Sequence, residues 1–113
     1  MILKEGVSLA GLHLLMRPVL REAERIWKEN GQSEGVTVTC ALGGVHSAAS
    51  WHYYGLALDL RNRYFSEGVK DKVAVELKQA LPYYDILAHS THIHVEPSNG
   101  LANKHGLLIV GRL

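Results

Sequence analysis

The stretch that decides the fold is His52-Tyr-Tyr-Gly55-Leu-Ala57-Leu-Asp59-Leu60. From Gly55 onward, leucines alternate with the small residues Gly55 and Ala57 and with the acidic Asp59. Side chains of a β-strand point alternately to opposite faces, so the pattern predicts a strand with one apolar face and one nearly bare face. We expect the bare face to leave room beside the Asp59 carboxylate.

His52 precedes Asp59 by seven positions, an odd separation that a straight strand would place on opposite faces. Gly55 permits a bend between them, because glycine tolerates backbone conformations that other residues avoid. We therefore expect a loop to carry His52 back over the face on which Asp59 lies.

A second stretch, His92-Ile-His94-Val-Glu96, alternates in the same way. As a strand it presents His92, His94 and Glu96 on one face and directs the two β-branched residues between them into the core. Two imidazoles and one carboxylate are typical of a catalytic zinc site, which has three protein ligands and keeps a fourth position for water. Together the two stretches predict one zinc ion bound by His52, Asp59 and His94.

The composition of the chain is that of an ordinary globular domain. Its 113 residues suit a single domain (1–113), of which 47% are apolar and 20% are charged. The formal net charge is +1 at pH 7 and lysines and arginines form no run, so we expect neither nucleic acid nor a membrane as a partner. Seven histidines are a surplus for this length, and six of them lie between His46 and His105, which indicates metal or proton chemistry. The sequence carries no signal for an oligomeric state.

The N-terminus and the single cysteine give no sign of export. Residues 1–7 contain Lys4 and Glu5 and no long apolar stretch, so we expect no secretory signal and synthesis in the cytoplasm. No window of the sequence is apolar for long enough to span a bilayer. Cys40 is the only cysteine, which excludes an internal disulfide, and we interpret it as a small buried residue near the end of a strand rather than as a nucleophile.

Helical spacing of apolar residues extends over residues 8–30. Ser8 is the expected N-cap and Gly31 the expected stop. Pro18 either kinks this helix or starts a second one, because proline cannot donate an intrahelical hydrogen bond.

The rest of the chain predicts one further helix and several short strands. Ser66 is expected to cap a helix over residues 67–81, and Pro97 is expected to begin a loop. This order favours an α+β fold with a small antiparallel sheet flanked by helices. The predicted strands, besides the one that carries Asp59, are residues 36–40, 84–87, 92–96 and 107–110.

The pattern resembles a known family. Ser50-x-His52-x-x-Gly55-x-Ala57-x-Asp59, followed by His92-x-His94, resembles the zinc D-alanyl-D-alanine carboxypeptidases and L-alanyl-D-glutamate endopeptidases. Many of these are bacterial or phage enzymes that cleave peptidoglycan stem peptides. The hedgehog signalling domain shares their fold, and residues 46–55 are especially similar to it. The resemblance covers residues 36–97 and implies a hedgehog-like peptidase fold.

The resemblance also implies a role for each matching position. The three predicted ligands take the places of the family's zinc ligands. His92 takes the place of a histidine that lines the site and donates a hydrogen bond to the developing oxyanion. Ser50 and His46 fall at positions that contact the substrate or line the site, and hydrogen bonding within the loop is the alternative for both.

One position departs from the family pattern. Active members place a carboxylate a few residues before the last histidine ligand, where it accepts a proton from water and passes it to the leaving amine. Here the nearest residue is His89, and no glutamate lies between Glu76 and Glu96. We favour His89 as the general base; alternatively it is a fourth ligand that closes the site, or Asp85 or Glu96 supplies the carboxylate.

Two functions follow from the sequence. The first is a zinc metallopeptidase that cleaves short D-amino-acid-containing peptides of peptidoglycan, of the D,D-carboxypeptidase or the L-Ala-D-Glu endopeptidase type. Such an enzyme would reach the cell wall by a phage route or act on recycled peptides. The second is a weak or inactive zinc-stabilised binding domain of the same fold. Arg61 and Arg63 follow Asp59 closely, and they either hold a substrate carboxylate or form a solvated strand end.

Overall fold

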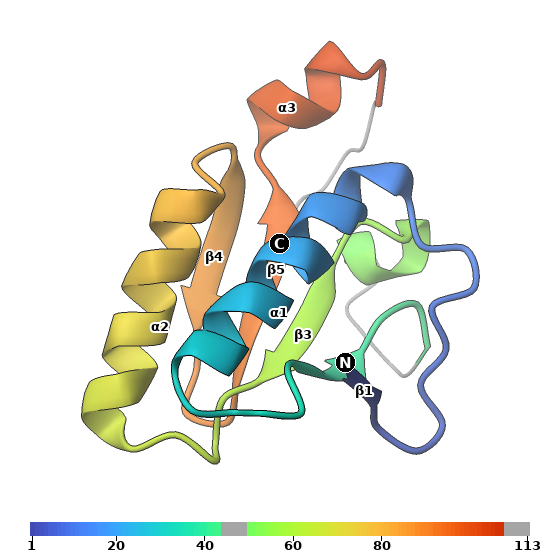
Figure 1. Ribbon diagram of the computed structural model, residues 1–113. Coiled ribbons are helices and arrows are strands. Elements are labelled where there is room, and N and C mark those ends of the chain that lie inside the picture. The colour runs from blue at the N-terminus through green and yellow to red at the C-terminus, as the bar shows by residue number, and fades with distance from the viewer. Residues whose placement is uncertain (44–49, 108–113) are drawn as a thin grey trace.

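The computed structural model describes residues 1–43 and 50–107, which form one five-stranded sheet with the strand order β1-β2-β3-β5-β4 (Figure 1). β1 pairs with β2 in parallel, and the other neighbouring strands are antiparallel. The α+β class is thus confirmed, and the expected antiparallel sheet is corrected to a mixed one, because an N-terminal strand that the sequence analysis missed joins its edge. The strands are β1 (Ile2–Leu3), β2 (Thr37–Cys40), β3 (Leu58–Arg61), β4 (Tyr84–Ala88) and β5 (His92–Pro97).

Two helices cover one face of this sheet. α1 (Arg17–Glu29) and α2 (Glu67–Ala80) pack against each other in front of the strands in Figure 1. No helix within the described ranges is long and apolar enough to cross a membrane. The shorter helical elements are η1 (Leu14–Met16), η2 (Trp51–Tyr54) and α3 (Asn99–Lys104).

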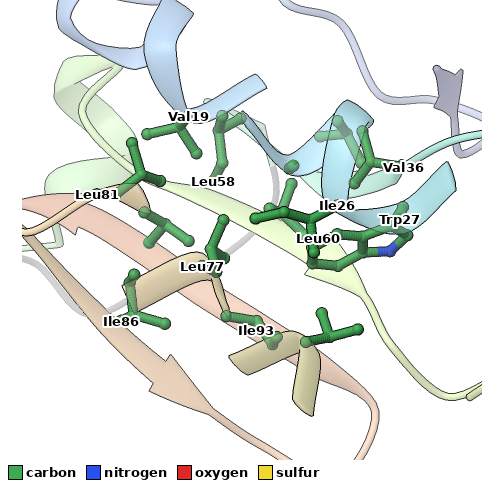
Figure 2. Packing of buried hydrophobic residues seen from close by; sticks show 14 of the residues in the cluster. Val19, Ile26, Trp27, Val36, Leu58, Leu60, Leu77, Leu81, Ile86 and Ile93 are labelled. Atoms are coloured by element: carbon green, nitrogen blue, oxygen red, sulfur yellow. The ribbon is translucent and has the colours of Figure 1, made fainter. Parts of the chain in front are cut away.

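The core lies between the two long helices and the sheet (Figure 2). Leu58 and Leu60 of β3 and Ile93 of β5 are fully buried there, under Ile26 of α1 and Leu77 of α2. Burial of one large apolar side chain stabilises the fold by roughly 1.5–3 kcal/mol. The predicted alternation is confirmed for Leu58, Leu60 and Ile93, whereas Leu56, expected on the same face, lies before β3 in a second apolar cluster.

α1 starts later than the helical spacing predicted. Residues 8–13 form no helix, and the Ser8 hydroxyl accepts a hydrogen bond from the Ala10 amide at 3.1 Å instead of capping a helix. Pro18 lies in the first turn of α1, where its missing N–H removes no intrahelical hydrogen bond. Of the two alternatives for Pro18, the start of a helix is confirmed. Gly31, at a φ of 96°, follows the C-cap as expected.

The segment after β5 differs from the prediction. The Ser98 hydroxyl accepts a hydrogen bond from the Leu101 amide at 3.1 Å and caps α3, where a loop was expected. Six residues are too few to show helical periodicity, so this helix could not be predicted from apolar spacing. Of the predicted strand at residues 107–110, Leu107 lies outside any strand and the other three positions fall outside the described residues.

Candidate metal centre

The face of the sheet opposite the helices carries the polar residues of β3 and β5. Asp59 lies directly opposite His94, and Arg61 directly opposite His92. The apolar residues that alternate with them are buried under α1 and α2, so these four side chains share the other face, which we call the open face. Cβ atoms of directly opposed residues lie about 4.5–5.5 Å apart, so the strand register alone brings the Asp59 carboxylate to the His94 imidazole.

His52 reaches the same place from η2. Gly55 ends this turn at a φ of 70°, and a Cβ atom there would lie 2.4 Å from the Gly11 carbonyl oxygen. Glycine is therefore required both by the left-handed backbone and by the close approach of another segment. The predicted bend is confirmed, because His52 Nε2 lies 3.4 Å from Asp59 Oδ1. His52 is buried, with an exposed fraction of 2%.

The hydrogen bond at the other ring nitrogen sets the tautomer of His52. Its Nδ1 lies 2.6 Å from the Ala41 carbonyl oxygen, which can only accept, so Nδ1 carries the proton. In the neutral ring, Nε2 then turns a lone pair toward the Asp59 carboxylate. Two acceptors that face each other are favourable only when a proton or a metal cation lies between them.

His94 approaches the same carboxylate from β5. Its Nδ1 lies 2.9 Å from Asp59 Oδ1, and its ring centroid lies 5.0 Å from that of His52. Ligand atoms about 2.1 Å from a tetrahedral zinc ion are about 3.4 Å apart. The separation of His52 Nε2 from Asp59 Oδ1 has this value, whereas His94 Nδ1 lies at the shorter distance of a hydrogen bond to the same oxygen. The donors at this point are two imidazoles and a carboxylate, and this chemistry fits a zinc ion.

Glu96 holds the second nitrogen of His94. Its Oε1 lies 2.8 Å from His94 Nε2, and the glutamate is 2% exposed. Burial disfavours the charged imidazole, but the hydrogen bonds and charges of Asp59 and Glu96 outweigh burial and raise the pKa of His94 to about 9. Burial likewise opposes ionisation of Asp59, yet the hydrogen bonds that His52, with a proton on Nε2 as well, and His94 donate hold the pKa of that carboxyl far below its usual value. The centre therefore favours positive charge between its carboxylates.

The sequence analysis missed Cys40 as a possible ligand. The β2–β3 register shifts between Val38 and Cys40, and this irregularity places Cys40 opposite Asp59. One ligand atom each from Cys40, His52 and Asp59 lies within 4.8 Å of the others, so this group can hold a metal ion. Burial and the Asp59 charge raise the pKa of the Cys40 thiol. Cys40 lies at the end of β2 as predicted and is half-buried; only the strand register reveals its proximity to Asp59.

His89 and His92 form a pair of rings at the β4–β5 turn. Their centroids lie 4.8 Å apart at an interplanar angle of 33°, and the His89 amide donates to the His92 carbonyl. His89 is exposed and His92 is half-buried. Burial lowers the pKa of His92; Asp59 opposes this, whereas His89 and the two other nearby imidazoles reinforce it. The two rings thus stack beside the centre, at the turn that leads into β5.

The remaining predicted positions have mixed outcomes. The Ser50 hydroxyl accepts a hydrogen bond from the His52 amide at 3.2 Å, which confirms hydrogen bonding within the loop and leaves substrate contact a prediction. His46 lies outside the described residues. Ala57 was expected to keep the open face clear, but it is fully buried with Trp51, Leu56 and Ala102 in a second apolar cluster.

The two other carboxylates considered for proton transfer lie opposite each other. Asp85 of β4 pairs in register with Glu96 of β5. Because Glu96 is engaged with His94 Nε2, its position is that of a residue that orients the His94 ring.

Comparison of the chain with protein-family models, with curated proteins and with solved structures found no match. What the centre can do must therefore follow from its own residues. These are Asp59 between two imidazoles, a thiol within ligand distance, and a pair of histidines at the rim.

Proposed function

We propose that this protein is a zinc-dependent peptidase that hydrolyses short D-amino-acid-containing peptides of bacterial peptidoglycan. One observation carries the proposal: His52 Nε2 and His94 Nδ1 both face the Asp59 carboxylate on a sheet face that the long helices leave open. Three nitrogen and oxygen ligands with one open position are the arrangement of catalytic zinc sites. The resemblance of the motifs to zinc D-alanyl-D-alanine carboxypeptidases and L-alanyl-D-glutamate endopeptidases supports the substrate class.

The chain's own contacts orient the proposed ligands. The Ala41 carbonyl accepts from His52 Nδ1 and Glu96 holds His94 Nε2, so the other nitrogen of each ring is directed at Asp59. Such outer contacts set ring orientation and ligand basicity in zinc proteins. A bound zinc ion would polarise the scissile carbonyl and activate water for its attack.

The histidines at the rim supply proton transfer. The lowered pKa of His92 favours the neutral ring, one nitrogen of which can donate a hydrogen bond to the oxyanion as the carbonyl is attacked. The Thr91 hydroxyl lies 3.2 Å from His92 Nδ1 and orients the ring, which leaves Nε2 for the substrate. His89, exposed beside His92, accepts the proton of the attacking water and returns it to the leaving amine.

The test is a cleavage assay with the zinc-loaded chain and a panel of peptidoglycan stem peptides, analysed by mass spectrometry. Loss of terminal D-alanine defines a carboxypeptidase and cleavage within the stem an endopeptidase. Either activity should disappear with a chelator and in the variant His94→Gln, and it should persist in His105→Gln, which removes an exposed histidine of α3's C-terminal end. Absence of product across the panel, with one equivalent of zinc bound, would contradict the proposal.

The position of Cys40 favours a second candidate, a zinc-stabilised binding domain without catalysis. With Cys40 as a ligand beside His52 and Asp59, His94 would complete a closed set of four, which is typical of structural zinc. The variant His89→Glu separates the two functions. It introduces the carboxylate that active members of the similar family have near this position. Peptidase activity should then rise if the zinc ligands and His92 act as proposed, whereas a structural zinc site should stay inactive.

A further inference from the structure

The turn between β4 and β5 carries the histidines at the rim of the candidate metal centre. It contains His89, Ser90 and Thr91 and leads into β5 at His92. The His89 amide donates to the His92 carbonyl oxygen at 2.8 Å, so the hairpin already closes on itself. All three turn residues are exposed. A turn of this kind needs no further support, because its carbonyl oxygens can accept hydrogen bonds from water.

The carbonyl oxygens of this turn nevertheless accept hydrogen bonds from two other parts of the fold. The Asn62 side-chain amide donates to the His89 carbonyl oxygen at 3.0 Å, and the Asn62 backbone amide donates to that of Thr91 at 3.2 Å. Between them, Lys70 Nζ donates to the Ser90 carbonyl oxygen at 2.7 Å. Three consecutive carbonyls are therefore held from outside the hairpin. We call these three hydrogen bonds the turn clamp.

Both donor residues lie on elements that are themselves fixed. Asn62 directly follows β3, the strand that carries Asp59, and is buried with an exposed fraction of 1%. Its own carbonyl oxygen accepts from the Phe65 amide at 3.0 Å. Lys70 lies near the start of α2, at the end of the sheet where β4 turns into β5 (Figure 1). The strand that carries the central carboxylate thus also holds the turn with the rim histidines.

The Lys70 contact acts on geometry more than on stability. Ordering a lysine side chain costs conformational entropy, which offsets much of the gain from one hydrogen bond. The side chain is only 15% exposed, and its Nζ also lies 3.1 Å from Glu67 Oε1, which restrains the amine further. Supporting contacts of this kind hold reacting groups in place, and a displacement of about 1 Å can cost about 100-fold in rate.

We propose that Asn62 and Lys70 are positioning residues for the histidines at the rim. This inference rests on the proposed peptidase function and assigns the residues that prepare its proton transfer. The turn clamp fixes the backbone at residues 89–91 and so keeps the His89 ring beside that of His92, with their centroids 4.8 Å apart. His89 is then in place before water is activated, which removes the entropic cost of ordering it in the transition state.

The first test measures cleavage of stem peptides by zinc-loaded variants of Lys70. Lys70→Met keeps the length of the side chain and removes the donor, so kcat should fall about 10-fold or more while KM and zinc affinity stay unchanged. Lys70→Arg again supplies a cationic donor and should recover most of the rate. Lys78→Met, an exposed change on the same helix, is the matched control and should leave kcat unchanged.

A variant of Asn62 tests the other donor. Asn62→Leu keeps the branched shape of the side chain and removes its polar atoms, so it frees the His89 carbonyl oxygen. It should lower kcat at least as far as Lys70→Met does, again without loss of zinc affinity. If Asn62→Leu does not fold, the Lys70 variants decide alone. A loss of zinc affinity as large as the loss of kcat in these variants would make the clamp a structural feature and overturn the proposal.

NMR separates the fate of this inference from that of the peptidase function. In the chain with one equivalent of zinc, ring protons of His89 and His92 should give cross-relaxation peaks, which weaken in Lys70→Met and return in Lys70→Arg. If no peptide is cleaved but the peaks change in this way, the clamp stands and the peptidase function fails. Peaks that are the same in Lys70→Met as in the unsubstituted chain overturn the clamp, even if peptides are cleaved.

Discussion

The two faces of the sheet are built from the same strands and have opposite characters. On β3, Leu58 and Leu60 are fully buried under the helices. Asp59 and Arg61, which alternate with them, lie on the open face and are only half-buried. One face holds the fold together by apolar burial, and the other gathers titratable groups. A shift of one residue in register would exchange the two sets, so the apolar face also determines which side chains meet at the candidate metal centre.

The contrast between the two faces predicts its largest effect for the free energy of unfolding of variants at two adjacent residues of β3. Leu60→Ala should lower the free energy of unfolding by about 2–5 kcal/mol, because it leaves a cavity beneath α1. Arg61→Ala, one position along and on the other face, should change it by less than about 0.5 kcal/mol. Urea unfolding monitored by circular dichroism measures both. Similar losses for the two variants would mean that the open face also stabilises the fold.

The next effect concerns metal binding at Asp59. Asp59→Asn keeps the shape of the side chain but removes the charge that lies between His52 and His94, so zinc affinity should fall more than about 100-fold. Asp71→Asn, an exposed change on α2, is the matched control and should bind zinc like the unsubstituted chain. Competition with a chromogenic chelator measures the affinities, and an unchanged affinity in Asp59→Asn would place the metal elsewhere.

The pH dependence of stability should report the same centre in chelator-treated protein. The pKa of His94 is raised from 6.5 to about 9, so its contribution is fully present below pH 6.5 and is lost as the pH rises through about 9. The expected loss is roughly 2–3 kcal/mol between these limits. Denaturant titrations from pH 6 to 10 measure it. A flat profile would show that the ion pairs with Asp59 and Glu96 do not form in solution.

A smaller effect is expected for the residue behind the ligand. Glu96→Gln leaves a hydrogen-bonding group at His94 Nε2 but removes its charge, so zinc affinity should fall by about 10- to 100-fold, which is less than for Asp59→Asn. Glu76→Gln, on α2 and away from the centre, is the control. The same competition assay applies; a loss as large as that of Asp59→Asn would instead make Glu96 a direct ligand.

The sequence predicted the two faces better than it predicted their edges. Strict alternation in residues 55–60 and 92–96 predicted, for the parts that form β3 and β5, which side chains enter the core and which share the open face. The same alternation suggested that Ala57 clears space, but strand β3 begins only at Leu58, so the residue before it packs with η2 and α3. Alternation along the sequence predicts the direction of side chains only within the strand. Outside the strand, packing against other segments determines where a side chain lies.

Cys40 and Gly55 show what a single sequence leaves out. The proximity of Cys40 to Asp59 depends on an irregularity in the β2–β3 register, which no spacing along the chain encodes. Gly55 was correctly expected to bend the chain, but its second reason, contact with the Gly11 backbone, comes from a segment over forty residues away in the sequence. Both features arise from contacts between segments distant in the sequence, whereas the spacing of His52 and Asp59 lies within one short stretch of the chain.

Zinc-edge X-ray absorption of the chain with one equivalent of zinc tests the central claim most directly. The account predicts a first shell of nitrogen and oxygen atoms only, at about 2.0–2.1 Å, with the imidazole scattering of two histidines. A sulfur atom at about 2.3 Å would make Cys40 a ligand and the centre a closed structural site. Failure to retain zinc at all would contradict a metal centre on the open face.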